Sequence, residues 1–355
     1  MNYAGRIRSL QKSLKKNRFF YAAGHSDIFY LSGFSGTFAR ILVSADKAVF
    51  ITDPRYEGAL NRSCVPHLFE TVITRSLKKD LLPLAGRKNR ILISVSTPLN
   101  DYLLLSENNT KPEISSLLSL LRSVKDADEI ALIKKASLIA GLASQHTASI
   151  LKRGITEDEA AFEYEKYARQ HGAESLSFAP IVAFGANSAV PHHATGSTRL
   201  KKGDLVLIDA GVKYRGYCSD LTRVYAFCII HPRLKELRKI FNYVKNAKKN
   251  AAKTLKNGVL AEKPGKAAGE YLKSNGGLDI YFTHSIGHGL GIDVHEEPFL
   301  GRSGSIVLKT GNVVTIEPGV YFPGKYGIRT EDDYLIGRAG CVKLSRAEDS
   351  LAEIG

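Results

Sequence analysis

The sequence predicts an α+β protein with two domains. Its 355 residues are enough to bury two hydrophobic cores. Residues 19–111 alternate short apolar segments with turns and helical stretches, which is typical of a small α/β domain. The remainder starts with a long helical pattern and ends in strands and turns. Because the pattern changes around residues 110–125, we expect one domain at 1–119 and a second at 120–355.

Composition excludes several protein classes. No apolar run is long enough to cross a membrane, so no membrane partner is expected. Residues 1–20 are basic but lack the apolar core and cleavage site of a secretory signal, which indicates a cytoplasmic protein. The 4 cysteines form no Cys-x-x-Cys pair, which argues against a zinc ribbon, a redox motif and a disulfide framework.

The net charge of +15 raises the question of a polyanionic partner such as nucleic acid. Much of this charge lies in residues 233–256, where apolar residues form one helical stripe and lysines fill the opposite face. A solvated helix face explains this pattern, and no nucleic-acid-binding motif accompanies it. Nucleic acid is therefore not expected as a partner, and a functional basic surface is the alternative.

The first domain is expected to contain short strands and helices. Residues 1–20 carry Ile7, Leu10 and Leu14 at helical spacing. No metal-ligand or nucleophile pattern occurs in this domain, so we expect it to shape a site or to contact another subunit. Its short apolar segments are residues 19–22, 28–31, 41–43, 48–52 and 90–95.

The second domain is expected to begin with two helices. Residues 126–151 show a helical pattern. Thr156 and Glu159 form a capping-box pattern that opens the next helix, and Gly172 closes it. Residues 182–195 then form a loop rich in Gly, Asn, Pro and His.

A hairpin is expected after this loop. Residues 206–208 are typical of a buried strand, Gly211 and Gly216 are turn signals, and residues 217–224 form the returning strand. The elements that follow are the basic helix at 233–256, a shorter helix at 264–274, and strand and turn segments at 281–286, 313–321 and 327–336.

This hairpin carries two carboxylates, Asp209 and Asp220, that a strand alone does not need. If its strands pair antiparallel, the two groups come close on one face. They would then repel each other and resist burial unless a cation or a proton lies between them. Surface carboxylates beside a turn are the alternative.

Three later segments supply groups of the same kind. His284 and His288 have the spacing of a helical metal pair, but the glycines around His288 argue against a helix and let the backbone pass close to a site. Glu317 ends an apolar strand, and Glu331 lies within another. Four carboxylates and one histidine are hard to bury without metal. This ligand set suits divalent ions such as manganese, cobalt, iron or zinc, and five ligands suit two ions.

The set Asp209, Asp220, His288, Glu317 and Glu331 resembles, in order, spacing and local sequence, the five metal ligands of the methionine aminopeptidase and prolidase superfamily. That resemblance implies a pita-bread catalytic domain from about Arg122 to the end of the chain. The motifs around residues 184–192, 217–223, 284–289 and 294–296 are similar to those of the proline-specific branch. Residues 30–36 and 52–56 are similar to its creatinase-type N-terminal domain.

The resemblance also implies a role for each residue. Asp220 and Glu331 would bridge two divalent metal ions, manganese first, with cobalt, zinc or iron as alternatives. Asp209 would complete the ligands of one ion, and His288 with Glu317 those of the other. Glu317 also matches the usual general base.

Four further residues are expected around the metal ligands. His192 and His295 would bind the substrate carbonyl and stabilise the tetrahedral intermediate. His284 would line the pocket on the proline side, and Arg329 would orient a bridging carboxylate. His193, which follows His192 where many relatives have another residue, is expected at the rim or facing solvent.

The resemblance predicts a cytoplasmic metallopeptidase that cleaves between an N-terminal residue and proline. Aminopeptidase P activity on longer peptides is the first expectation, and a prolidase acting on Xaa-Pro dipeptides is the alternative. Intact ligands oppose a non-catalytic module that binds protein or nucleic acid. Relatives are often dimers, so a homodimer is expected. The choice of substrate length is expected to depend on the loops and the N-terminal domain.

Overall fold

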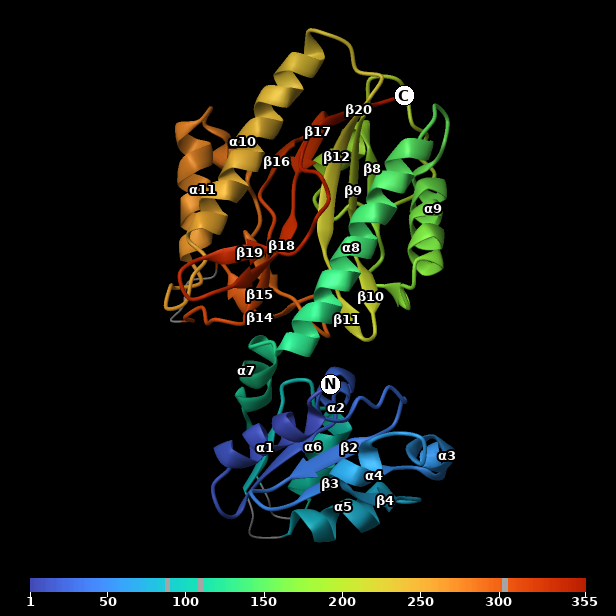
Figure 1. Cartoon of the computed structure of the whole chain (residues 1–355), viewed down its shortest axis with the longest axis vertical. Helices are drawn as coiled ribbons and strands as arrows, with labels where there is room; N and C mark the ends of the chain where they lie inside the picture. The colour runs from blue at the N-terminus through green and yellow to red at the C-terminus, as the bar shows by residue number, and fades with distance from the viewer. Residues whose placement is uncertain (87–89, 108–110, 302–305) are drawn as a thin grey trace. The chain divides into compact units, whose positions relative to one another are not determined.

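The chain forms two compact units, Met1–Arg122 and Ser123–Gly355, in a computed structural model that describes residues 1–86, 90–107, 111–301 and 306–355 (Figure 1). The chain passes from one unit to the next within helix α7 (Leu117–Ser123), which contains Ser119. Among the described residues, no helix combines the length and apolar character that a membrane crossing requires.

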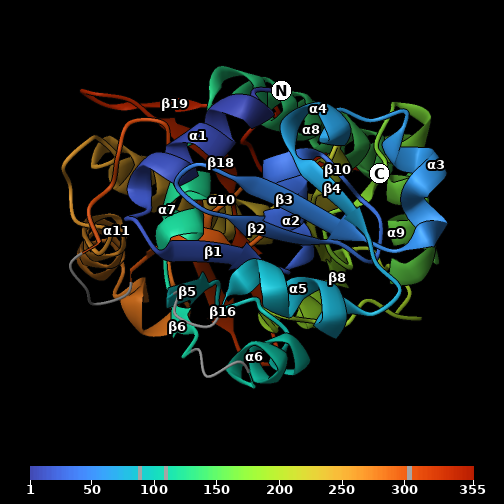
Figure 2. The ribbon, with the colours of Figure 1, turned by 90° about the horizontal axis from the view of Figure 1, so that it is seen from below.

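The N-terminal unit is built on one mixed sheet, in which the described strands follow the order β4-β3-β2-β1-β5-β6. Strands β1, β2 and β3 pair antiparallel, and the outer strands add in parallel (Figure 2). Buried side chains such as Tyr21, Leu42 and Ile51 form its core. The strands are β1 (Arg18–Ala22), β2 (Arg40–Val43), β3 (Ala48–Thr52), β4 (Glu70–Ile73), β5 (Arg90–Ile93) and β6 (Glu113–Ile114).

Helices of this unit cover the sheet. Helix α1 begins at Tyr3 after the N-cap residue Asn2, and it buries Ile7 and Leu10, the apolar positions expected from their spacing. The apolar segment 28–31 lies in helix α2 rather than in a strand. The helices are α1 (Tyr3–Ser13), α2 (His25–Ser32), α3 (Glu57–Leu60), α4 (Val65–Leu68), α5 (Leu77–Ala85) and α6 (Leu99–Ser106), and Pro54–Tyr56 form a 3-10 turn.

Two pairs of helices enclose the strands of the C-terminal unit. Helix α8 (Ala127–Ile150) packs with α9 (Glu157–Gln170), and α10 (Arg233–Lys253) packs with α11 (Lys263–Ser274) (Figure 1). Both α8 and α9 begin with a complete capping box, in which the N-cap side chain accepts from the backbone of the third helical residue. The basic face of α10 is exposed, whereas Leu237, Phe241 and Val244 are buried.

The strands between these helices form several sheets. One has the order β20-β12-β9-β8, another β14-β13-β15-β18-β19, and smaller sheets join β11-β10-β7 and β16-β17. Their bounds are β7 (Ser175–Leu176), β8 (Ile181–Phe184), β9 (Leu205–Ala210), β10 (Val212–Tyr214), β11 (Tyr217–Cys218), β12 (Leu221–Phe227), β13 (Gly287–Gly289), β14 (Glu296–Leu300), β15 (Val313–Ile316), β16 (Gly319–Phe322), β17 (Tyr326–Arg329), β18 (Asp332–Ile336), β19 (Cys341–Lys343) and β20 (Ala352–Ile354).

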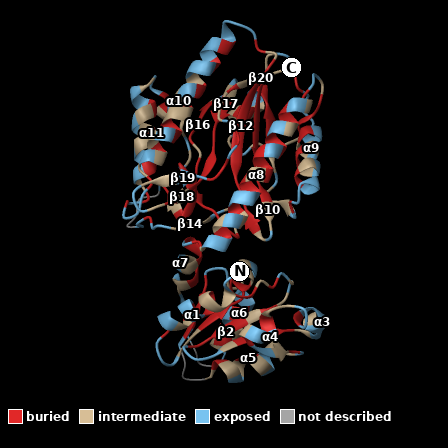
Figure 3. Cartoon of the chain, viewed as in Figure 1, coloured by how far each residue is buried: buried red, intermediate tan, exposed pale blue. Residues whose placement is uncertain are grey.

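Strand β9 is buried on both faces. Leu205 and Leu207 belong to the core beneath α10 and α11, whereas Val206 and Ile208 belong to the core beneath α8 and α9. Successive side chains of a strand point to opposite faces, so this alternation places β9 between the two helix pairs. Figure 3 shows the buried strands in red between helices whose outer faces are exposed.

The expected hairpin is present but divided. Its inner part pairs β9 with β12, and its outer part pairs β10 with β11 around a turn at Gly216, where φ is 81°. At Gly211, a Cβ atom would lie 1.8 Å from the Ser219 carbonyl oxygen, so only glycine fits between the two parts.

Three expected strand segments differ from the structure. Residues 281–286 contain the end of a 3-10 turn (Leu278–Tyr281) and no strand. The segments 313–321 and 327–336 are each divided between two sheets, at Glu317 and Glu331 respectively. Glu317 and Glu331 therefore lie between strands and not within one.

Candidate metal centre

Two strands bring Asp209 and Asp220 to one face. Asp209 lies in β9 opposite Thr222 of β12, and Asp220 precedes Thr222 by two residues. Side chains two residues apart in extended chain point the same way, so Asp220 and Thr222 face the same side. Both aspartates are buried.

The other half of the site comes from β13, β15 and the turn before β18. His288 is the central residue of β13, Glu317 follows β15, and Glu331 follows β17. Close packing around His288 requires glycine: a Cβ atom on Gly287 would lie 2.1 Å from the Thr315 carbonyl oxygen. The backbone N–H of Glu317 donates to the Ile286 carbonyl oxygen at 2.8 Å, which ties the two segments together.

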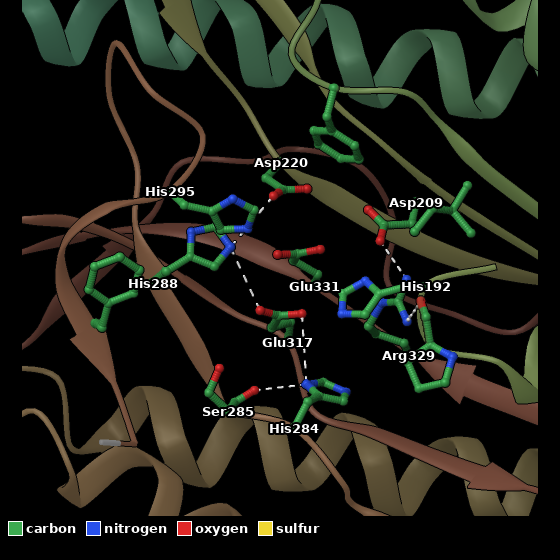
Figure 4. Close-up of a pocket in the computed structure, with 14 residues that line it drawn as sticks. His192, Asp209, Asp220, His284, Ser285, His288, His295, Glu317, Arg329 and Glu331 are labelled. Carbon is green, nitrogen blue, oxygen red and sulfur yellow. Dashed lines mark hydrogen bonds and ion pairs between the residues drawn. The ribbon is translucent and has the colours of Figure 1, made fainter. Parts of the chain in front are cut away.

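These residues form a compact cage. One ligand atom each from Asp220, His288 and Glu331 lies within 4.8 Å of the others. His288 Nε2 lies 3.7 Å from Asp220 Oδ2 and 3.7 Å from Glu317 Oε1 (Figure 4). His288 Nδ1 lies 3.1 Å from the Gly289 carbonyl oxygen, so the ring proton is on Nδ1 and is donated to that oxygen. The lone pair on Nε2 therefore faces the carboxylates.

Three carboxylates of the cage each have one oxygen atom without a hydrogen-bond donor among the described residues. Within the described residues, Asp209 Oδ1, Asp220 Oδ1 and Glu331 Oε1 are buried and accept no hydrogen bond. Burial, followed by repulsion from neighbouring carboxylates, raises the pKa of Asp220 and of Glu331 well above their usual values. Burial also raises the pKa of Glu317 to about 8.

This arrangement fits a divalent cation. Carboxylate oxygens and an imidazole nitrogen are ligands that manganese, cobalt, iron and zinc accept, and a cation would satisfy the unpaired oxygens and remove the repulsion. The fit depends on the donor atoms and their burial, and all four metals accept these donors.

Arg329 joins several parts of the site. Its guanidinium donates to Asp209, to the Tyr321 hydroxyl at 2.7 Å and to Thr222 Oγ1 at 3.2 Å. Thr222 Oγ1 in turn donates to Glu331 Oε2 at 2.8 Å. Arg329 therefore contacts Asp209 directly and reaches Glu331, the expected bridging carboxylate, only through Thr222.

All of the expected site residues line one cavity of about 400 Å³ (Figure 4). Its apolar walls include Phe178, Ile181 and Phe299. The expected site residues are His192, Asp209, Asp220, His284, His288, His295, Glu317, Arg329 and Glu331.

The histidines occupy different surroundings within this cavity. The His295 ring meets the His288 ring edge to face, with centroids 4.2 Å apart. His284 is held at both nitrogens, by the Ser285 carbonyl oxygen at 2.8 Å and by the Tyr321 hydroxyl at 2.9 Å. Burial lowers the pKa of His284 and of His288 to about 4, so both rings are neutral near pH 7.

Sequence reasoning missed several residues of the site. Thr222 and Tyr321 were not expected, although Thr222 shares the period-two face of Asp220. His193 does not face solvent, which was one of its two expected positions: its side chain is 16% exposed, and Nε2 lies 2.8 Å from Oε2 of the buried Glu157. The reason is that Glu157, far upstream in sequence, supplies a buried partner.

Comparisons with known proteins identify related families over most of the chain. Residues 131–338 match Metallopeptidase family M24, and residues 6–126 match the Creatinase/Prolidase N-terminal domain. The chain is 33% identical to the Xaa-Pro dipeptidase of Pyrococcus furiosus over 354 residues, which cover 98% of this chain and 99% of that protein.

Two solved structures are similar over almost the whole chain. The Xaa-Pro dipeptidase from Bacillus anthracis is 30% identical, with a TM-score of 0.92, and the match covers 99% of this chain and 100% of that chain. The X-Pro aminopeptidase from Thermotoga maritima is 31% identical, with a TM-score of 0.85, and the match covers 97% of this chain and 99% of that chain.

Proposed function

Because this chain belongs to metallopeptidase family M24, we propose that it hydrolyses the bond between an N-terminal residue and a following proline, with Xaa-Pro dipeptides as preferred substrates. The family match confirms the resemblance identified in the sequence. It also confirms the α+β fold class, a C-terminal pita-bread domain preceded by a creatinase-type α/β domain.

One observation supports this proposal most strongly. The buried oxygens Asp209 Oδ1, Asp220 Oδ1 and Glu331 Oε1 accept no hydrogen bond within the described residues, and they lie in the same cavity as His288 and Glu317. Burying unpaired carboxylates is costly unless a cation binds them. A purely structural role does not explain these three carboxylates, because their burial without a bound cation lowers the stability of the fold.

Membership of family M24 implies divalent metal ions, and the proposed number is two. Asp220 and Glu331 would be shared by both ions, Asp209 would hold one of them, and His288 with Glu317 would hold the other. Manganese is the first choice, with cobalt, zinc or iron as alternatives. When bound, such ions polarise the scissile carbonyl and make water a stronger nucleophile.

The remaining residues act on the substrate. Glu317 accepts the proton of the attacking water, and its place beside His288 suits both this task and metal binding. His192 and His295 contact the carbonyl oxygen, where negative charge develops in the transition state. His284, held by Tyr321 and Ser285, presents a fixed neutral ring to the proline side.

The length of the substrate is the finer part of the proposal. The relative in Pyrococcus furiosus and the structure from Bacillus anthracis are both named Xaa-Pro dipeptidases, which favours the dipeptide over the longer peptides that the sequence put first. The similarity to the X-Pro aminopeptidase from Thermotoga maritima makes aminopeptidase activity the second candidate.

Steady-state kinetics test both parts. Purified protein loaded with manganese is assayed on an Xaa-Pro dipeptide and on the matching Xaa-Pro-Yaa tripeptide, with Xaa-Ala peptides as controls. We expect a higher kcat/KM on the dipeptide. A higher value on the tripeptide would support the aminopeptidase, and no hydrolysis of either proline peptide after loading with each of the four metals would refute the enzyme proposal.

A further inference from the structure

A buried carboxylate outside the cavity accepts hydrogen bonds from several residues in and beside the loop that carries His192. Glu157 is the first residue of α9, and its side chain is fully buried. Its Oε1 accepts from the backbone N–H of Phe184 at 2.9 Å and from Asn187 Nδ2 at 2.8 Å. Its Oε2 accepts from His193 Nε2 at 2.8 Å and from the Gly196 N–H at 3.3 Å.

These four donors span the whole loop. The loop begins after Phe184, the last residue of strand β8, and not at residue 182 as expected from the sequence; Asn187 and His193 lie within it, and Gly196 follows it. A second tie runs the other way, because the backbone N–H of Asp158 donates to the Gly196 carbonyl oxygen at 3.0 Å. The position of Glu157 at the N-terminus of α9 also favours a negative charge there.

The His192 ring has no such support of its own. Within the described residues it makes no hydrogen bond, although it lines the cavity beside Arg329 (Figure 4). Its two neighbours are held instead: Arg329 donates to the Pro191 carbonyl oxygen at 3.3 Å, and the His193 ring donates to Glu157. The position of the His192 ring therefore depends on the backbone between these two anchors.

We propose that Glu157 and His193 form a positioning pair that fixes His192 for the substrate carbonyl. This inference rests on the proposed function, because it assigns the pair an effect only through His192. Neither residue is among those that line the cavity, so they are not catalytic. Transition-state contacts are sensitive to displacements of about 1 Å, which can cost about 100-fold in rate. Loss of the His193–Glu157 hydrogen bond removes the tie next to His192, which allows such a displacement of its ring.

A double-mutant cycle tests the coupling. kcat/KM on an Xaa-Pro dipeptide is measured for the manganese-loaded wild-type protein, His193→Ala, His192→Ala and the variant carrying both changes. We expect His193→Ala to lower kcat/KM about 10- to 100-fold in the wild-type background. In the His192→Ala background the same change is expected to cost less than about 2-fold, because the residue it positions is gone.

Further variants separate positioning from stability. Glutamine can donate from Nε2 as the imidazole does, so His193→Gln is expected to recover most of the activity that His193→Ala loses. Glu157→Gln is expected to match His193→Ala in kcat/KM. Glu165→Gln, on the exposed face of the same helix, is the matched control and is expected to leave kcat/KM unchanged. Thermal melts identify any variant that unfolds.

Two results would overturn the inference. One is an equal loss from His193→Ala in both backgrounds, which would show a general structural effect. The other is an unchanged kcat/KM in a folded His193→Ala protein. Absence of proline-peptide hydrolysis by the metal-loaded wild-type protein is a different outcome, which refutes the proposed function and this inference with it.

Discussion

Removal of the metal should make the stability of the protein fall as pH rises above 6.5. Burial holds the pKa of Glu317 at about 8 in the folded metal-free protein, against an ordinary value of 4.5. The folded state therefore keeps a proton that the unfolded state has lost. Stability from such a group is complete below the ordinary pKa and is lost as pH rises through the folded-state pKa.

The pH window can be chosen so that the histidines do not interfere. His284 and His288 have their pKa lowered from 6.5 to about 4, so they reduce stability only below about pH 6.5. From pH 6.5 to 8, one retained proton at Glu317 costs about 2 kcal/mol, at about 1.4 kcal/mol per pH unit. The Glu317 side chain is 18% exposed, which screens part of this cost. Asp220 and Glu331 act with the same sign because their pKa values are also raised.

Calorimetry measures this effect directly. Protein dialysed against a chelator is melted at several pH values between about 6.5 and 9, with and without added manganese. We expect Tm of the metal-free protein to fall by about 4–8 °C for the 2 kcal/mol from Glu317, because a unit of this size shifts by about 2–4 °C per kcal/mol. Glu317→Gln should flatten this slope. A flat or rising Tm in metal-free protein, or an equal fall with metal bound, would refute the reasoning.

Three substitutions test other parts of the structure. Glu317→Gln should lower kcat by about 100- to 10,000-fold, since it removes the proposed general base, while circular dichroism stays native; a fully active variant would contradict the proposed role of Glu317. Thr222→Val should weaken manganese binding about 10- to 100-fold in titration calorimetry, because the expected bridging carboxylate loses a donor at 2.8 Å; Thr222→Ser, which retains the hydroxyl, should bind as the wild type does. Lys248→Met should destabilise the protein by about 1–3 kcal/mol in denaturant melts, because buried Asp332 loses one ion-pair partner but keeps Arg223 and Lys343, whereas exposed Lys249→Met should change little.

Short sequence patterns predicted helices in both units. The capping box of Thr156 and Glu159 places the start of α9 within one residue, since both of its reciprocal hydrogen bonds form between neighbours in sequence. The apolar spacing of Ile7 and Leu10 likewise predicts the buried face of α1. Such features depend on contacts over a few residues, which a sequence pattern contains.

Long-range features were predicted less completely. The strand-end position of Asp209 and Glu317 pointed to the cage, but the contacts of Tyr321 and Thr222 depend on how distant strands align. The environment of His193 depends on Glu157, and no local pattern connects the two. Interruption of an expected strand at Glu317 follows from Pro318, which lacks an N–H donor, together with a change of sheet.

The order of the metal ligands along the chain bears on how the protein matures. Asp209 lies before helix α10 and Glu331 follows β17, so the cage joins segments that are synthesised at different times. Contacts of such wide sequence separation form late in folding. A nascent chain can thus pack α8 and α9 before it has a complete ligand set. Metal binding by the complete proposed ligand set therefore requires that the chain has been synthesised through Glu331.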